Sequence, residues 1–302
     1  MARPLRIEFA GALYHVTGRG NERKAIVRGD DDRRDWIATL AQVVSRFDWC
    51  VDAYCLMDNH LHLLVETPNA NLARGMRQLN GVYAQRFNGR HGRFGHLFGG
   101  RYKAILVQRE PHLLELCRYI VLNPARSESA PRSYETFPWS SYRATAGLVP
   151  VPAFLRPTAV LRHFDGDLAE ARRRYREFVR AGLGGAQVPE EVVGEVYLGD
   201  RDFVRGHTAP NACVEIPRVQ REPVRCSLEG LFEHDLQDAV ARAYREHGYS
   251  LREIAAVLGV HYSTVSRRLR REEAWSAGVA LQDLTPNGDV RPRRERGKPT
   301  WV

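Results

Sequence analysis

The sequence predicts an α+β domain with an antiparallel sheet, followed by a small all-α domain. Four short apolar runs with alternating or β-branched character are typical of strands, and longer segments with helical spacing lie between them. Their order is strand, helix, two strands, helix, strand, helix, which indicates a sheet with helices packed on it. Beyond residue 227 only helical spacing recurs, so a separate helical domain is expected there.

The first half of the α+β domain is expected to contain three strands and one helix. The first strand spans about 11–17 and ends in a glycine-rich turn, Gly18–Arg23, whose backbone and arginines suit contact with phosphate or base edges. An amphipathic helix follows at Asp30–Phe47. The strand Trp49–Leu56 then leads into a strand that begins at His60, and we expect these two strands to pair in antiparallel fashion.

The second half of the α+β domain also alternates between helices and strands. Helical spacing covers Asn71–Arg90, and the arginines on its outer face are expected to be solvated. The stretch His91–Lys103 mixes glycine, basic and aromatic residues, a composition that suits stacking of bases and neutralisation of phosphates. A strand over Ala104–Val107 precedes a helix that starts near Pro111 and ends before Pro124, because proline suits a first helical turn and disfavours continuation.

Two histidines mark the strand at residue 60. His60 and His62 are two positions apart, so their side chains share one face of the strand while Leu61 and Leu63 point the other way. Two imidazoles on a rigid strand make half of a metal site. The alternative is a polar strand face that carries two histidines by coincidence.

A tyrosine and an asparagine mark the helix before Pro124. Tyr119 and Asn123 are four residues apart and therefore lie one turn from each other on one helix face. One interpretation is a sheet-covering helix whose tyrosine hydroxyl reaches water. The other is a tyrosine nucleophile, with Asn123 directed toward the same metal as His60 and His62.

These motifs carry a resemblance to a known family. His60-Leu61-His62 resembles the His-hydrophobic-His motif of the HUH single-strand DNA endonucleases and transposases, and Tyr119 resembles their single catalytic tyrosine. Within that superfamily the chain is most similar to the REP-associated tyrosine transposases of bacteria, which share the motifs in the same order over roughly residues 5–145. The further matching segments are Tyr14–Asn21, Met57–His60 and Trp139–Tyr142.

The resemblance implies a fold, an activity and a substrate. The fold is the ferredoxin-like HUH domain, expected over 1–148, with the histidine strand central. The activity is metal-dependent cleavage and rejoining of single-stranded DNA through a 5′-phosphotyrosine at Tyr119, on repeated palindromes that form hairpins. Mg²⁺ or Mn²⁺ would be held by His60, His62 and Asn123, and no small-molecule cofactor is expected. Related enzymes differ in whether the tyrosine acts within its own subunit, so a monomer and a dimer both stay open.

The charge of the chain also indicates a nucleic-acid partner. The net charge is +9, and only three of its 45 basic residues are lysines. Arginine binds phosphate bidentately and stacks on bases, although genome composition is another source of arginine. In the α+β domain we expect DNA contacts from Gly18, Arg19, Asn21, Arg23, Arg101 and Lys103.

The remainder of the chain is expected to hold three parts. Residues 149–226 form a helical and irregular connecting region, with a basic helix at 169–181 that either contacts DNA or packs with its arginines in solvent. Residues 227–276 show a helix-turn-helix pattern, in which Ser250 opens a helix through a capping box and Gly259 ends it. A plain three-helix bundle with a basic face is the alternative. Residues 277–302 form a basic tail expected to be disordered. The helix-turn-helix DNA contacts are expected from Thr264, Arg267, Arg268 and Arg271.

Cysteine usage and hydropathy indicate the cytoplasm, and the resemblance implies a bacterial protein that associates with the nucleoid. The five cysteines are odd in number and form no Cys-x-x-Cys pair, as in proteins of a reducing compartment. No signal segment or membrane span is evident. Two other functions stay open: a metal-dependent DNA hydrolase without a covalent intermediate, and a DNA-binding regulator whose front domain is inactive.

Overall fold

The computed structural model describes residues 7–127, 132–184, 192–207, 227–232, 236–245, 247 and 249–276. The chain divides into two compact units, Met1–Thr208 and Ala209–Val302. The tail predicted over 277–302 lies outside the described residues. In the described part of the chain, no helix is long and apolar enough to cross a membrane. Cys50, Cys55 and Cys117 are free thiols.

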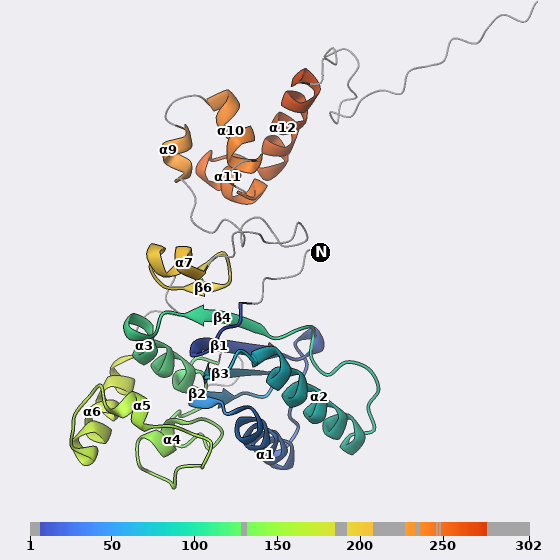
Figure 1. Ribbon diagram of the computed structural model, residues 1–302. Coiled ribbons are helices and arrows are strands. Elements are labelled where there is room, and N and C mark those ends of the chain that lie inside the picture. Colours follow the sequence, from blue (N-terminus) through green and yellow to red (C-terminus); the bar gives the residue numbers. More distant parts are fainter. Residues whose placement is uncertain are drawn as a thin grey trace, which may run out of the picture. The chain divides into compact units, whose positions relative to one another are not determined.

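The front unit is built on a sheet whose four main strands have the order β2-β3-β1-β4. These strands are β1 (Ala12–Arg19), β2 (Cys50–Leu56), β3 (His60–Thr67) and β4 (Lys103–Val107), and all their pairings are antiparallel. Figure 1 shows them side by side in this order. The order and the βαββαβ succession confirm the ferredoxin-like fold, with the histidine strand β3 central between β2 and β1.

Two helices cover one face of this sheet. Helix α1 (Asp30–Phe47) connects β1 to β2, and α2 (Leu72–Arg90) connects β3 to β4. Leu61, Leu63 and Val65 of β3 are fully buried, as the alternation predicted. On the same face, the ring of Trp36 in α1 packs at 6.5 Å from that of Tyr54, the β2 partner of Leu63.

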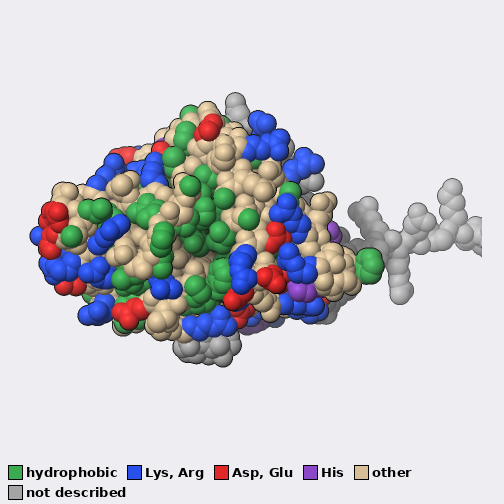
Figure 2. All heavy atoms as spheres, turned by 90° about the horizontal axis from the view of Figure 1, so that it is seen from below, with side chains coloured by type: hydrophobic (Ala, Val, Ile, Leu, Met, Phe, Trp, Pro, Cys, Tyr) green, Lys and Arg blue, Asp and Glu red, His purple; other side chains and the backbone are tan. Residues whose placement is uncertain are grey.

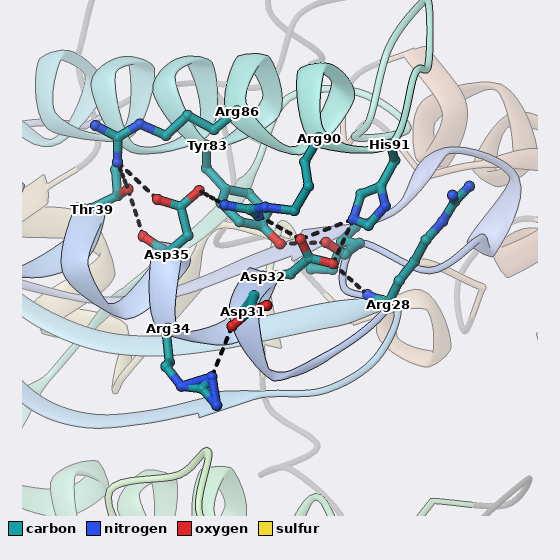
Figure 3. Close-up of polar contacts among 11 residues, drawn as sticks. Arg28, Asp31, Asp32, Arg34, Asp35, Thr39, Tyr83, Arg86, Arg90 and His91 are labelled. Carbon is teal, nitrogen blue, oxygen red and sulfur yellow. Dashed lines mark hydrogen bonds and ion pairs between the residues drawn. The ribbon is translucent and has the colours of Figure 1, made fainter.

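Ion pairs join α1 to α2 (Figure 3). Asp32 accepts hydrogen bonds from Arg90 at 2.6 Å and from His91 at 2.9 Å, and its side chain is almost fully buried. Asp35 accepts from Arg86 at 2.9 Å. The arginines at the C-terminal end of α2 are therefore neutralised by carboxylates of α1.

Helix α3 (Arg109–Leu122) covers the other face of the sheet. Leu113, Leu116, Cys117 and Ile120 lie on one side of this helix and are buried in a core cluster. The sheet contributes to this cluster the residues Leu13, Ala53, Cys55, Leu64 and Val107. Because Leu64 lies two positions after His62, the two histidines face the same side as α3.

The segment after residue 148 extends the front unit. Helices α4 (Tyr142–Thr145), α5 (Thr158–Leu161) and α6 (Leu168–Ala181) share the core of α3. Strands β5 (Val192–Val193) and β6 (Tyr197–Leu198) add a hairpin beyond β4, where β6 runs parallel to β4. Helix α7 (Arg201–His207) follows.

The predicted basic helix corresponds to α6, and its inner face consists of Ala171, Tyr175 and Val179. Its arginines are engaged locally, since Arg173 pairs with Glu170 at 2.6 Å and with Glu177 at 2.5 Å. Figure 2 shows acidic and basic side chains interspersed around an apolar area on the face seen from below. The helix therefore packs on the core by its apolar face, and Arg173 and Arg174 form ion pairs at its exposed face.

The back unit is a small helical domain. Its helices are α9 (Leu228–Phe232), α10 (Leu236–Arg245), α11 (Leu251–Val257) and α12 (Tyr262–Ser276). The predicted capping box is present, because Ser250 Oγ accepts from the Glu253 amide at 3.2 Å and Glu253 Oε2 accepts from the Ser250 amide at 2.7 Å. Gly259 adopts a φ of +64° after α11, as a helix end requires. Ile254, Val265 and Leu269 form part of its core.

Candidate active site

The hairpin between β2 and β3 fixes the position of His60. The Met57 amide donates to the His60 carbonyl at 2.9 Å, so Asp58 and Asn59 form a two-residue turn. The Asp58 carboxylate accepts from Arg132 at 2.6 and 3.1 Å and also from Arg33. The turn is thereby fastened to α1 and to the segment after α3.

The Asn59 side chain orients the His60 ring. Its amide nitrogen donates to the Arg23 carbonyl at 3.2 Å, so its Oδ1 is the atom that accepts from His60 Nδ1, at 2.7 Å. His60 Nε2 is then the nitrogen that carries the lone pair. Burial, together with the nearby positive charge of Arg19, lowers the pKa of His60, which keeps the ring neutral.

A third histidine, His15 on β1, orients the His62 ring. His15 Nε2 lies 3.0 Å from His62 Nδ1, and the two rings stack with centroids 5.3 Å apart. Both side chains are buried, at 3% and 7% exposure. Burial lowers the pKa of His15 to about 4, and burial with the proximity of His15 lowers the pKa of His62 well below its ordinary value. Both rings are therefore neutral at physiological pH.

Tyr119 and Asn123 approach the histidines from α3. The Tyr119 ring stands edge-on to His62 at 5.6 Å and to His15 at 6.0 Å. Asn123 follows the last residue of the helix, and its Nδ2 donates to the Tyr119 carbonyl at 3.0 Å. The Asn123 side chain also lies close enough to His60 and Tyr119 to raise the pKa of His60 and to lower that of Tyr119. Helix α3 and strand β3 thus bring together Tyr119, Asn123, His60 and His62.

The Tyr119 hydroxyl lies in a mixed electrostatic environment. Burial raises its pKa, while Arg126, Asn123 and Arg19 act in the opposite direction. The Arg126 guanidinium lies 5.6 Å from the centre of the Tyr119 ring and donates to the Gly182 carbonyl at 3.0 Å. The phenol is protonated in the free protein, and two guanidinium groups are placed to stabilise its anion.

One cleft of about 960 Å³ joins these groups. Its wall at the end of β1 needs glycine, because a Cβ at Gly20 would lie 2.0 Å from the Lys24 carbonyl oxygen. Beside it Glu22 and Arg23 adopt φ values of +54° and +60°, a left-handed conformation that is strained for residues with side chains. The cleft lining includes all ten site residues predicted in the front domain: Gly18, Arg19, Asn21, Arg23, His60, His62, Arg101, Lys103, Tyr119 and Asn123.

Sequence reasoning missed three residues of this site, namely His15, Asn59 and Arg126. Alternation along β1 puts His15 on the same face as Thr17 and Arg19, but its contact with His62 depends on the register between β1 and β3. Asn59 lies in Met57–His60, a segment that carries the resemblance, but it was given no role of its own. Arg126 lies beyond Pro124, where the helical pattern had ended, and gave no periodic signal.

The predicted DNA-contacting residues of the back unit lie on α12. Thr264 and Arg267 are exposed, and Arg268 is half-buried, while Val265 and Leu269 hold the helix to the core. The side chain of Arg271 lies outside the described residues. Thr264 and Arg267 are therefore accessible to a partner, as the predicted DNA contacts require.

A metal site made only of common ionisable ligands is not found here. Among the described residues, no three or more His, Cys, Asp or Glu side chains form a group that could hold a metal ion. The donor set in the cleft is instead two neutral imidazoles and one carboxamide.

Comparisons with known proteins found family matches in both units. The family model of IS200-like transposases matches residues 9–123, and a helix-turn-helix domain model matches residues 240–272. A search of curated proteins found no match. A solved structure described as a REP-associated tyrosine transposase bound to a REP hairpin is 15% identical, with a TM-score of 0.42. The match covers 50% of this chain and 89% of that one, and a likeness at this level is too remote to assign a function.

The family match indicates a role in DNA transposition and enzymatic DNA cleavage or transfer. It includes β1, β3 and α3, the elements that supply the cleft. Residues 9–123 are therefore similar to the IS200-like transposases, and residues 240–272 are similar to helix-turn-helix domains.

Proposed function

We propose that the front unit cleaves and rejoins single-stranded DNA through a covalent bond between Tyr119 and a 5′ phosphate. The observation that carries the proposal is the meeting of His60, His62, Tyr119 and Asn123 in one cleft. Arg19, Arg23, Arg101 and Lys103 line the same cleft and supply positive charge for the DNA backbone. This combination of a nucleophile, neutral metal donors and phosphate-binding groups fits phosphoryl transfer.

We infer that His60, His62 and Asn123 hold a divalent cation, either Mg²⁺ or Mn²⁺. Each imidazole uses Nδ1 for a neighbouring side chain, so Nε2 remains for a metal, and both rings are neutral. A carboxamide oxygen suits both cations, and imidazole suits Mn²⁺ better than Mg²⁺. When bound, such a cation polarises the scissile phosphate and stabilises charge on its oxygens.

The cleavage step follows from the position of Tyr119. Its hydroxyl oxygen attacks phosphorus and loses its proton to solvent, while Arg126 and Arg19 stabilise the developing phenolate. The bond from phosphorus to the 3′ oxygen breaks, and that oxygen takes up a proton and leaves as a 3′ hydroxyl. Because the phosphotyrosine ester preserves an activated phosphoryl group, a 3′ hydroxyl can reverse the step and join strands without another energy source.

The substrate we propose is a hairpin with flanking single-stranded DNA. The support for a hairpin is the ordered set of motifs shared with the REP-associated tyrosine transposases. The helix-turn-helix domain supplies a second DNA-binding module, whose helix α12 presents Thr264 and Arg267. Such a helix suits the major groove of a duplex.

Trapping of a covalent adduct tests the proposal. The full chain is incubated with single-stranded oligonucleotides labelled at either end, with Mn²⁺ or with a chelator, and the products are separated under denaturing conditions. We expect the 3′ label to shift to the protein and the 5′ label to leave on a fragment that ends in a 3′ hydroxyl. Two free fragments without an adduct would indicate hydrolysis by water. Binding without cleavage would indicate a regulator.

The His15→Phe variant is expected to bind Mn²⁺ about 10- to 100-fold more weakly, as is typical when an outer partner of a metal-ligating histidine is removed. A metal on His62 Nε2 requires the hydrogen on Nδ1, which then donates to His15 Nε2. Phenylalanine keeps a ring but cannot accept that hydrogen bond. Mn²⁺ affinity, measured by electron paramagnetic resonance without DNA, reports this effect.

The His15→Gln variant is the matched control, because its side-chain oxygen can accept from His62. It should recover most of the Mn²⁺ affinity. Thermal unfolding of both variants distinguishes a missing hydrogen bond from a disrupted fold. Equal Mn²⁺ affinity for wild type and His15→Phe would show that His15 only fills the core.

The double variant Arg267→Ala and Arg268→Ala is expected to bind duplex DNA more weakly and with a flatter salt dependence. Removing one phosphate-binding side chain lowers the log–log slope on duplex DNA by about 0.9, because fewer counterions are released. Fluorescence anisotropy over a range of salt concentrations measures the slope. An unchanged slope and affinity would favour a plain helical bundle for the back unit.

A further inference from the structure

Helix α2 carries two kinds of arginine. Arg86 and Arg90, near its C-terminal end, are neutralised by Asp35 and Asp32 of α1, as Figure 3 shows. Arg74 and Arg77, near its N-terminal end, are exposed, and neither forms an ion pair within the described part of the chain. The structure therefore leaves positive charge available at one end of α2 only.

The unpaired arginines border two hollows beside the cleft. The first, of about 460 Å³, lies between α2 and the segment before β4, and it shares Gly100 and Arg101 with the cleft. The second, of about 430 Å³, lies between the end of α1 and α2, and it shares Arg74 and Arg77 with the first. The three hollows thus adjoin one another in series. The lining of the two outer hollows contains no acidic residue: Arg46, Phe47, Ala73, Arg74, Met76, Arg77, Gln78, Asn80, Gly81, Val82, Gln85, Gly100, Arg101 and Tyr102.

Aromatic contacts hold part of this surface in place. The guanidinium groups of Arg46 and Arg74 lie 5.6 and 5.7 Å from the centre of the Phe47 ring, within the range of a cation–π contact. Arg46 also donates to Gln78 at 2.9 Å. A guanidinium held by a ring keeps its remaining donors for a phosphate and loses less freedom when it binds one.

A bound strand must leave the cleft on either side of its scissile phosphate. Arg101 lines both the cleft and the first outer hollow, Arg74 and Arg77 line both outer hollows, and Arg46 lines the second. A row of cations without acidic neighbours complements the regular negative charge of a sugar–phosphate backbone. On the face in Figure 2, by contrast, acidic side chains are interspersed with the basic ones.

We propose that Arg46, Arg74, Arg77 and Arg101 form a track that binds the backbone of the single strand continuing from the cleft. The occupant is the flank of the cleaved strand, because it is covalently continuous with the nucleotides in the cleft. The proposal rests on the proposed function in placing DNA in the cleft. It adds a binding surface that extends the contact beyond the reacting phosphate and favours substrates with a longer single-stranded flank.

The double variant Arg74→Gln and Arg77→Gln tests the track in the full chain. The wild-type protein is expected to bind a hairpin with a long single-stranded flank more tightly than one with a short flank. The variant is expected to lose this gain in affinity from the long flank. For the hairpin with the long flank, the slope of log affinity against log salt concentration should become shallower by about 1.4, because each of the two lost contacts with a single strand contributes about 0.7. Adduct formation at Tyr119 on a short oligonucleotide should stay at the wild-type rate, because neither arginine lines the cleft.

The control variant Arg34→Gln and Arg180→Gln removes the same charge at positions that line none of the three hollows. It should keep the gain from the long flank. An equal loss in this control, or an undiminished gain in the track variant, would overturn the proposal. Weakened binding of a hairpin without any flank would also overturn it, since the track would then hold the duplex. If wild type binds long flanks with the expected slope but forms no adduct, the track stands and the proposed function fails.

Discussion

The Tyr119→Phe variant is expected to lose both strand cleavage and the covalent adduct. The substitution removes one oxygen atom, and no other group at that position can form a phosphoester. The cost in stability should be about 1 kcal/mol, the usual value of one hydrogen bond, because the Tyr119 hydroxyl interacts with Asn123 at the edge of a cleft. Denaturing gels with 3′-labelled single strands measure the adduct, and thermal unfolding checks the fold.

Other tyrosines of the front unit serve as internal controls for the assignment. The Tyr83 hydroxyl donates to the Ile26 carbonyl at 2.5 Å, and Tyr142 is buried among aromatic rings of the core. Tyr102 lines the first outer hollow and is not among the residues that line the cleft. Mass spectrometry of the nuclease-trimmed adduct should therefore find the nucleotide on Tyr119. A nucleotide on another tyrosine contradicts the assignment, and wild-type cleavage by Tyr119→Phe contradicts the mechanism.

The Asn123→Ala variant separates the nucleophile from its surroundings. Tyr119 is retained, so the adduct should still form, but slowly and only with more metal. The substitution removes the carboxamide proposed as the third donor, which lies beside His60. Alanine also leaves the helix end without the bond from Asn123 Nδ2 to the Tyr119 carbonyl. A rate and metal requirement equal to those of wild type would exclude Asn123 as a ligand.

The elements of the front unit could be predicted because their periodicities are strong. Alternation along β3 predicted that His60 and His62 would face away from Leu61 and Leu63, and helical spacing placed Tyr119 one turn from Asn123. Neither pattern shows that the strand and the helix lie next to each other in the fold. That step required the sheet order, which came from the resemblance. The structure then showed that Leu64, two positions after His62, lies in the core beneath α3.

The features that were not predicted depend on contacts between residues that lie far apart in the sequence. His15 meets His62 only because β1 and β3 pair in the observed register. Strands β5 and β6 are two residues long each, too short for a period to be visible. One prediction of a solvated face covered Arg74, Arg77 and Arg86. Arg86 nevertheless pairs with Asp35 of α1, while Arg74 and Arg77 form no ion pair in the described part of the chain. Which arginine meets a carboxylate is decided by helix packing.

The His60→Ala variant is expected to lower the cleavage rate by more than about 100-fold, since even outer partners of metal ligands contribute 10- to 100-fold. His60 is partly exposed in the cleft, so its removal leaves only a small change in the core. Hairpin binding should persist, because the arginines of the cleft and of α12 are untouched. Cleavage of labelled single strands at saturating Mn²⁺ measures the rate, and anisotropy measures the binding.

The His62→Ala variant should lose cleavage to the same extent but also lose stability. His62 is buried, and its removal leaves His15 Nε2 without its partner as well as a cavity under α3. The two variants therefore differ in unfolding temperature while they agree in activity, a pattern that a purely structural role for the histidines does not produce. Full cleavage by a folded His60→Ala or His62→Ala protein would exclude the proposed metal site, because each variant retains only one of the two imidazoles that the site requires.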